Sequence, residues 1–145
     1  MIFDTDVLIW ALRGNDRAIK AIDSEPSRLI SAITYMEILK GARNKSELRE
    51  IRRYLLGMGF RTIHINEDIS SRAVSLVEIV CLKSDMGVSD ALIFATALHC
   101  GETLLSGNYH HFKEVPNLAA VRFSPFPAGK SQRVSTFAGE ADSDQ

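Results

Sequence analysis

MIFDTDVLIW, residues 1–10, places three apolar residues before two acids and then returns to an apolar run. The first three residues predict a short buried strand, and the apolar run after Asp6 predicts a helix that ends near Gly14. Asp4 and Asp6, on either side of Thr5, therefore lie where a strand gives way to a helix. Three interpretations are open for this pair: a metal site, the nucleophile and acid of a phosphoaspartate enzyme, or a helix cap.

The same alternation of strand and helix continues along the chain. Apolar runs predict further strands at residues 28–33, 61–65, 102–106 and 118–123. Helical spacing of apolar residues predicts helices at residues 17–23, 34–43, 45–57, 67–83 and 90–101. The last of these helices is apolar almost all round, which is typical of a central, buried helix. This alternation indicates an α/β fold with a parallel sheet covered on both faces.

Length and composition limit what the chain can be. It has 145 residues, 46% of them hydrophobic, and a net charge of -1, which is typical of one globular domain. We expect this domain to span residues 1–126, and residues 127–145 lose all periodicity and are expected to be a disordered tail. Two cysteines are too few for a disulfide framework, and no apolar run would span a bilayer. A cytoplasmic location is therefore expected, with no membrane association.

Acidic or amide side chains lie just beyond the expected strands. Asp4 follows the first strand, Glu37 lies one helical turn past the second, Asp90 opens the buried helix, and Asn108 follows the strand at residues 102–106. Ligands of open α/β sheets bind beyond the carboxyl ends of the strands. These four residues are therefore expected to meet at one edge of the sheet.

Each of these residues also has a structural explanation. Asp4 could cap the helix that follows it, and Thr34 with Glu37 fits the spacing of a capping box. Asp90 is favoured in the first turn of a helix by the helix dipole, and Asn108 suits a turn.

The convergence of these acids is harder to explain by capping alone. Two carboxylates about 4 Å apart repel each other by about 4 kcal/mol at an effective dielectric constant near 20. A divalent cation would remove this repulsion. Because the expected ligands are all oxygen atoms, we expect Mg²⁺ or Mn²⁺ rather than zinc. Open coordination positions on such an ion would admit a substrate phosphate and support phosphodiester hydrolysis.

Four blocks of sequence, in this order, carry a resemblance to a known family: FDTDVLIWAL, SAITYMEILKGAR, VSDALIFATAL and LLSGNYHHF. Together they resemble the PIN domain, in particular the VapC-like ribonuclease toxins of toxin–antitoxin modules. The resemblance implies a three-layer α/β/α sandwich around a central, mainly parallel sheet. It also implies a Mg²⁺- or Mn²⁺-dependent endoribonuclease, a cognate antitoxin as partner, and a homodimer.

By motif, the resemblance assigns the metal-binding and catalytic acids to Asp4, Glu37 and Asp90, with Glu37 acting directly or through water. Two hydroxyl residues, Thr5 and Ser106, match auxiliary positions of the family. Asp6 is a further auxiliary acid. The chain departs from the family at Asn108, where many relatives have Asp, so a second metal position there lacks charge.

Two rival functions remain open. FDTDV also resembles the opening motif of haloacid-dehalogenase-like phosphatases, in which Asp4 would be the nucleophile and Asp6 the general acid. That interpretation leaves Glu37 and the residues around Asn108 without a role. A PIN-like binding module without catalysis is the other alternative.

Residues outside the acid set offer contacts for RNA or proton transfer. Arg43 lies near the end of the helix that carries Glu37 and is the candidate for an RNA phosphate. His110 and His111 could carry protons, although they also fit an exposed turn. Asp85 is expected to be a solvated loop acid. The RNA target and the antitoxin leave no short motif in the sequence.

Overall fold

The computed structural model describes residues 1–128 of the chain, so the predicted tail lies outside the described residues apart from Pro127 and Ala128. Five strands and seven helices follow one another in this part. The strands are β1 (Ile2–Phe3), β2 (Arg28–Ser31), β3 (Phe60–Ile63), β4 (Leu104–Ser106) and β5 (Ala120–Arg122). The helices are α1 (Thr5–Leu12), α2 (Asp16–Asp23), α3 (Ala32–Lys40), α4 (Lys45–Gly57), α5 (Glu67–Val80), α6 (Val88–Cys100) and α7 (Tyr109–Phe112).

The five strands form one sheet in the order β3-β2-β1-β4-β5, and every pair of neighbours is parallel. β1 lies at the centre, with Ile2 opposite Leu29 on one side and Leu104 on the other. The chain builds outward from β1 through β2 to β3, and later fills the other side with β4 and β5. The carboxyl end of β1 is therefore the point where the strand order reverses, which is where open α/β sheets bind ligands.

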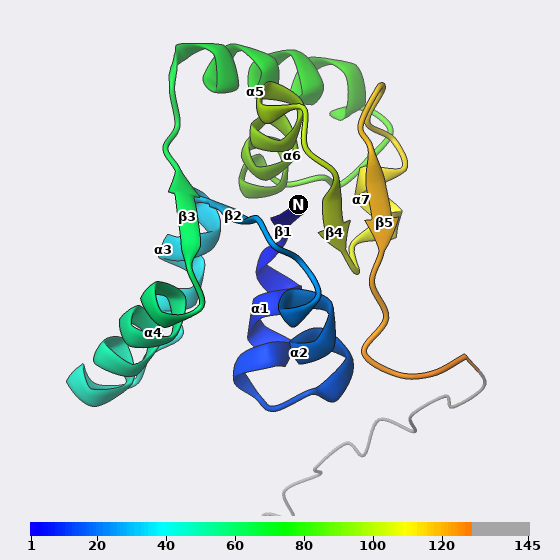
Figure 1. The fold of residues 1–145 in the computed structure, drawn as a ribbon. Coiled ribbons are helices and arrows are strands. Elements are labelled where there is room, and N and C mark those ends of the chain that lie inside the picture. The colour runs from blue at the N-terminus through cyan, green and yellow to red at the C-terminus, as the bar shows by residue number, and fades with distance from the viewer. Residues whose placement is uncertain (129–145) are drawn as a thin grey trace, which may run out of the picture.

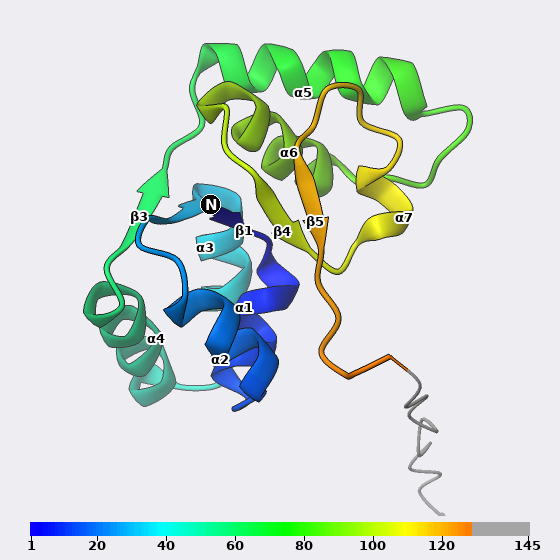
Figure 2. The same ribbon diagram turned by 45° about the vertical axis from the view of Figure 1, so that its right-hand side comes forward.

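Alternate residues of the central strands point to opposite faces of the sheet. Ile2, Leu29 and Leu104 pack against α5 and α6, whereas their neighbours Phe3, Ile30 and Leu105 pack against α1 and α2. Figures 1 and 2 show α5 and α6 on one side of the sheet and α1, α2 and α4 on the other. The predicted three-layer α/β/α sandwich is confirmed.

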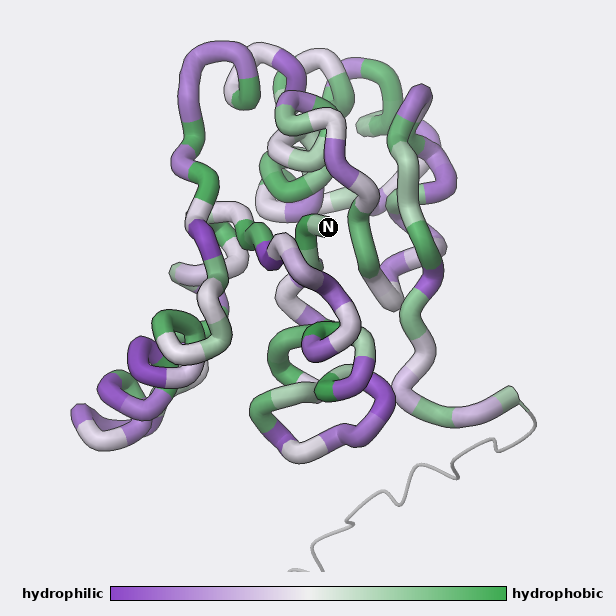
Figure 3. The backbone as a smooth tube through the Cα atoms, viewed as in Figure 1, coloured by the Kyte–Doolittle hydropathy of each residue, from purple (hydrophilic) through white to green (hydrophobic). Residues whose placement is uncertain are grey.

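α6 is the buried helix that the sequence predicts. Ala91, Ile93, Phe94, Ala95, Thr96 and Ala97 are all buried. The helix ends at Gly101, whose φ of 63° is left-handed and suits glycine best. In Figure 3, β4 and the start of the chain have the green of hydrophobic residues, whereas much of α4 has the purple of hydrophilic ones. No helix in residues 1–128 is long and apolar enough to cross a membrane.

Two local predictions are wrong. β2 ends at Ser31, which caps α3 by accepting a hydrogen bond from the Ile33 amide, so the helix begins earlier than Thr34. Thr34 is therefore buried inside the helix and forms no capping box. His110 and His111 lie in the short helix α7 rather than in a turn.

Candidate active site

Asp4 joins the central strand to the first helix. Its Oδ1 accepts a hydrogen bond of 2.7 Å from the Thr5 amide, so Asp4 is the N-cap of α1. Its Oδ2 accepts a hydrogen bond of 2.6 Å from the Ser106 hydroxyl at the end of β4. The residue is only 5% exposed. Helix capping is therefore real, but it uses one oxygen of a carboxylate that is otherwise buried at the centre of the sheet edge.

The electrostatic surroundings of Asp4 disfavour its charge. Its pKa is raised from 3.8 to about 7, first by burial, then by the nearby negative charge of Asp6, with a smaller contribution from Asp90. The hydrogen bonds from Ser106 and Thr5 act in the opposite direction. Burial also raises the pKa of Asp6, with Asp90 again contributing. Three carboxylates thus lie close enough to repel one another.

Asp6 is fixed by backbone amides rather than by cationic side chains. Its Oδ1 accepts from the Val7 amide at 2.8 Å, and its Oδ2 accepts from the Gly107 amide at 2.8 Å. A Cβ atom on Gly107 would lie 2.5 Å from Asp6 Oδ2. The loop after β4 can therefore approach Asp6 closely because residue 107 is glycine.

Glu37 faces α1 across the site. The Thr5 hydroxyl lies 2.8 Å from Glu37 Oε1 and donates to it, and it lies 3.1 Å from the Thr34 hydroxyl. Glu37 is exposed, in contrast to the buried Asp4. Thr5 is thus the residue that holds Glu37 toward the end of β1.

Asp90 reaches the site from the first turn of α6, where Gly87 is the N-cap. Its side chain is 27% exposed, and its Oδ2 lies 3.1 Å from Nδ1 of His111. The other ring nitrogen of His111, Nε2, lies 2.8 Å from Oδ1 of Asp85. The link from Asp90 to His111 was not predicted from the sequence. In the sequence, only the two adjacent histidines, His110 and His111, indicated that a titratable group could lie near the site.

Asn108 contacts the site through its backbone. Its amide donates a 2.9 Å hydrogen bond to the Ser106 hydroxyl, and Ser106 in turn donates to Asp4. The Asn108 side chain precedes α7 without capping it. Its amide oxygen is therefore free of a structural role in the start of that helix.

Arg43 lies outside the acid cluster. Its guanidinium pairs with Glu47 at 2.8 Å, and its side chain is 85% exposed. Both residues line a groove of about 710 Å³ between α1, α3 and α4, to which Glu37 also contributes. The groove therefore leads from Arg43 to one of the site acids.

The donor set suits a hard divalent cation. Asp4, Asp6, Asp90 and Glu37 offer only oxygen atoms, and within residues 1–128 no lysine or arginine pairs with any of them. The pKa values of Asp4 and Asp6 are raised, first by burial and then by neighbouring carboxylates, and the interactions that oppose the rise are hydrogen bonds rather than cationic side chains. Carboxylate oxygens with this arrangement fit Mg²⁺ or Mn²⁺.

The family of the chain follows from comparison with known proteins. The family model of the PIN domain matches residues 1–118. The chain belongs to the PIN domain family, whose members are nucleases. The phosphatase alternative is therefore wrong, because the chain belongs to a different family. A comparison with curated proteins finds no significant match.

Solved structures of toxin–antitoxin proteins are similar to the chain. A toxin–antitoxin complex from Klebsiella pneumoniae is 31% identical with a TM-score of 0.70, covering 86% of this chain and 97% of that one. VapBC2 from Rickettsia felis, bound to a DNA fragment from its promoter, is 21% identical with a TM-score of 0.73, over 86% and 100% of the two chains. VapC20 from Mycobacterium tuberculosis, a sarcin–ricin loop cleaving toxin, is 18% identical with a TM-score of 0.55, over 72% and 87%. The resemblance to VapC-like toxins is confirmed.

Proposed function

We propose that the protein is the endoribonuclease toxin of a toxin–antitoxin pair and hydrolyses RNA phosphodiesters with Mg²⁺ or Mn²⁺. The observation that carries this proposal is the cluster of Asp4, Asp6 and Asp90 at the carboxyl end of the central strand, where burial and mutual repulsion raise the pKa of Asp4 to about 7. Similarity to toxin–antitoxin complexes supports the proposal.

Each residue of the site has a role in this proposal. Asp4, Asp90 and Glu37 hold the ion, Glu37 directly or through water. When bound, the ion polarises a phosphoryl oxygen and lowers the pKa of the attacking water. Ser106 holds the Asp4 carboxylate, and Thr5 holds Glu37.

Two residues adjust the charge of the site, and a third contacts the substrate. Asp6 adds negative charge that Asn108 lacks, and Asn108 offers only a neutral amide oxygen to a second ion. Arg43, exposed on the rim of the groove, pairs with an RNA phosphate in place of Glu47.

The antitoxin and a second copy of the chain are the proposed protein partners. An antitoxin segment occupies the groove between α1, α3 and α4 and presents a basic side chain to the acid cluster, because within residues 1–128 that cluster has no lysine or arginine partner. A second copy covers the groove between α5 and α6 that is lined by the exposed Val74 and Val88, since monomers rarely leave a large apolar patch exposed. We place the protein in the cytoplasm, where its free cysteines Cys81 and Cys100 stay reduced.

The decisive experiment measures cleavage of a pool of structured RNAs in Mg²⁺ or Mn²⁺, with EDTA as a control. Asp4→Asn and Asp90→Asn should each abolish cleavage while the variants remain folded by circular dichroism. Asp16→Asn, which changes an exposed acid on α2, is the matched control and should cleave as the unaltered chain does.

The outcomes separate the remaining alternatives. Cleavage that persists in both site variants would contradict the proposal and indicate a contaminating nuclease. No cleavage by any form, together with no rise in melting temperature on adding Mn²⁺, would favour the binding module without catalysis.

A further inference from the structure

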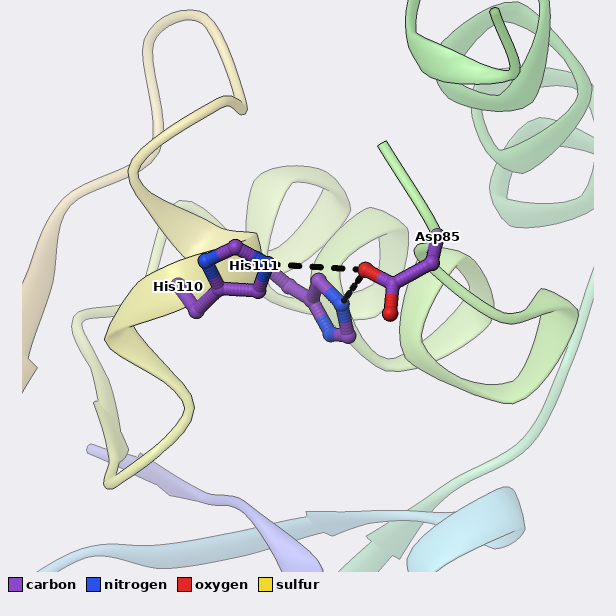
Figure 4. A group of neighbouring side chains, drawn as sticks. All are labelled: Asp85, His110 and His111. Atoms are coloured by element: carbon purple, nitrogen blue, oxygen red, sulfur yellow. Dashed lines mark hydrogen bonds and ion pairs between the residues drawn. The ribbon is translucent and has the colours of Figure 1, made fainter. Parts of the chain in front are cut away.

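Two histidines and an acid lie close together beside the proposed nuclease site, where one of the histidines contacts Asp90. Asp85 lies in the loop between α5 and α6, and His110 and His111 lie in α7. Asp85 Oδ1 is 2.8 Å from Nε2 of His111 and 3.5 Å from Nε2 of His110. Figure 4 shows both imidazole rings next to the Asp85 carboxylate. One ligand atom from each residue lies within 4.8 Å of the other two.

The chemistry of this cluster differs from that of the acid site. Imidazole nitrogen suits Zn²⁺, Ni²⁺ and Co²⁺, whereas Mg²⁺ strongly prefers oxygen. Ligand atoms of a tetrahedral zinc ion with bonds of about 2.0 to 2.1 Å lie about 3.3 Å apart. The separations between the two histidine nitrogens and the Asp85 oxygen fall around this value. His110 and Asp85 are 73% and 81% exposed, so a fourth position is open to water.

A second observation concerns the far side of the His111 ring. Among residues 1–128, Nδ1 of His111 is the one buried side-chain nitrogen or oxygen without a hydrogen-bond partner. It lies 3.1 Å from Asp90 Oδ2, close enough for an ion pair but not aligned as a hydrogen bond. A cation on Nε2 leaves the ring proton on Nδ1, beside the carboxylate of Asp90. Metal-binding histidines usually have such an acceptor behind them.

We propose that Asp85, His110 and His111 form a transition-metal site of the zinc class, and that His111 connects it to Asp90. This site goes beyond the proposed nuclease function, because an ion can bind to it without RNA and without the acid cluster. Its bound ion would lie one imidazole ring away from Asp90, so occupation of the site adds positive charge next to a proposed ligand of the nuclease metal.

Binding is measured by titrating the full chain with Co²⁺, following the visible absorption of tetrahedral cobalt, and with Zn²⁺ by calorimetry. His110→Gln should weaken binding at least tenfold. It replaces an exposed ligand, so the fold should be kept. His99→Gln is the matched control, because His99 also pairs with an acid, Asp68, but belongs to no three-residue cluster of this kind within residues 1–128. It should leave the affinity unchanged.

Three outcomes would overturn the proposal. The first is equal affinity for His110→Gln and the unaltered chain. The second is that His99→Gln weakens Zn²⁺ binding as much as His110→Gln does, which would indicate that the ion binds to separate surface histidines. The third is loss of Zn²⁺ binding in Asp4→Asn, which would place the ion in the acid site. Failure of RNA cleavage would not affect the titration, so the two proposals fail separately.

The link to Asp90 has its own readout. Nuclear magnetic resonance of the imidazole nitrogens should show, on adding Zn²⁺, that His111 keeps its proton on Nδ1 in slow exchange with water. Asp90→Asn should shift the resonance of this proton without abolishing Zn²⁺ binding. If the His111 proton resonance of the Zn²⁺-bound protein is the same with and without Asp90→Asn, the link between His111 and Asp90 is contradicted.

Discussion

The proposed chemistry depends on the residue Asp4. Burial of its charged carboxylate lowers the free energy of unfolding. Burial, together with the negative charges of Asp6 and Asp90, raises its folded pKa to about 7, above its ordinary value of 3.8. The folded state therefore favours the protonated form. The stability that this preference contributes is complete below about pH 4 and is lost as the pH rises through about 7.

Asp4→Asn should therefore stabilise the metal-free protein at pH 8 by on the order of 1 to 3 kcal/mol, and should change its stability little at pH 4.5. The asparagine can still accept from the Thr5 amide and meet the Ser106 hydroxyl, but it carries no charge. Urea unfolding in EDTA at the two pH values measures this difference. A gain that is equal at both values would show that the charge of Asp4 is not its cause. Asp16→Asn is again the control.

Gly107→Ala tests the contact between the loop after β4 and Asp6. The added Cβ would lie 2.5 Å from Asp6 Oδ2, so either the loop or the Asp6 side chain, which two backbone amides hold, must shift. We expect a loss of about 1 to 3 kcal/mol in unfolding free energy, as for other overpacked sites. Gly57→Ala, at a glycine with nothing within 4 Å of a Cβ, should be neutral or slightly stabilising. Equal effects of the two changes in urea unfolding would refute the steric explanation.

At the scale of the elements, α6 both fills the core and delivers Asp90. Its middle is buried, and Phe94 is fully buried under the sheet face that also holds Ile2 and Leu104. The helix can bring Asp90 to the sheet edge only because its apolar surface fixes its position against β1 and β4.

Phe94→Ala should consequently lower the unfolding free energy by about 3 to 5 kcal/mol, through lost burial and a residual cavity. Leu56→Ala in α4 changes a residue that is 83% exposed and should cost under about 0.5 kcal/mol. Thermal or urea unfolding compares them. A loss below about 1 kcal/mol for Phe94→Ala would mean that α6 is not the centre of the core.

Sequence patterns predict well wherever periodicity or strand alternation carries the signal. They predict α4 with both of its ends, the buried helix α6, and the place of Asp4 at the end of the first strand. They fail where two features compete or where an element is too short for a period. Ser31 and Thr34 can both cap a helix, and the apolar residues between them fit a strand as well as a helix. The four residues of α7 hold barely one helical turn, so the contact of His111 with Asp90 depends on tertiary packing alone.

At the scale of the whole molecule, an apolar face on α5 and α6 is left uncovered in the single chain. Val74 and Val88 are 57% and 69% exposed and line a groove with Val77 and Leu92. The net charge of -1 gives two copies little reason to repel each other.

Val74→Asp should therefore shift the protein from dimer to monomer in sedimentation experiments without unfolding it. Leu56→Asp places the same charge at an exposed leucine on α4, away from this face, and should leave the dimer intact. A chain that sediments as a monomer before any change, or a dimer that survives Val74→Asp, would contradict the proposed interface.

The boundary of the nuclease domain at residue 126 stays a prediction, and the residues before it are tied to α1 and α2. Pro125 accepts a hydrogen bond from the Asn15 side chain, Ser124 accepts one from Arg17, and Phe126 packs edge-on against Trp10. A chain that ends at Ala128 should keep the melting temperature of the full chain. A chain that ends at Phe123 should melt several degrees lower. Equal melting of both truncated forms would move the boundary toward the N-terminus.

The hydrogen bond from the Asn108 backbone to Ser106 also bears on how the protein can evolve. Because only the main chain of residue 108 holds the loop, its side chain can change without loss of the contact that orients Asp4. The codons for asparagine and aspartate differ by one base. A single point mutation could thus alter the number of charges at the sheet edge in either direction, so natural selection can tune the ion binding that we propose for this edge while the fold is left alone.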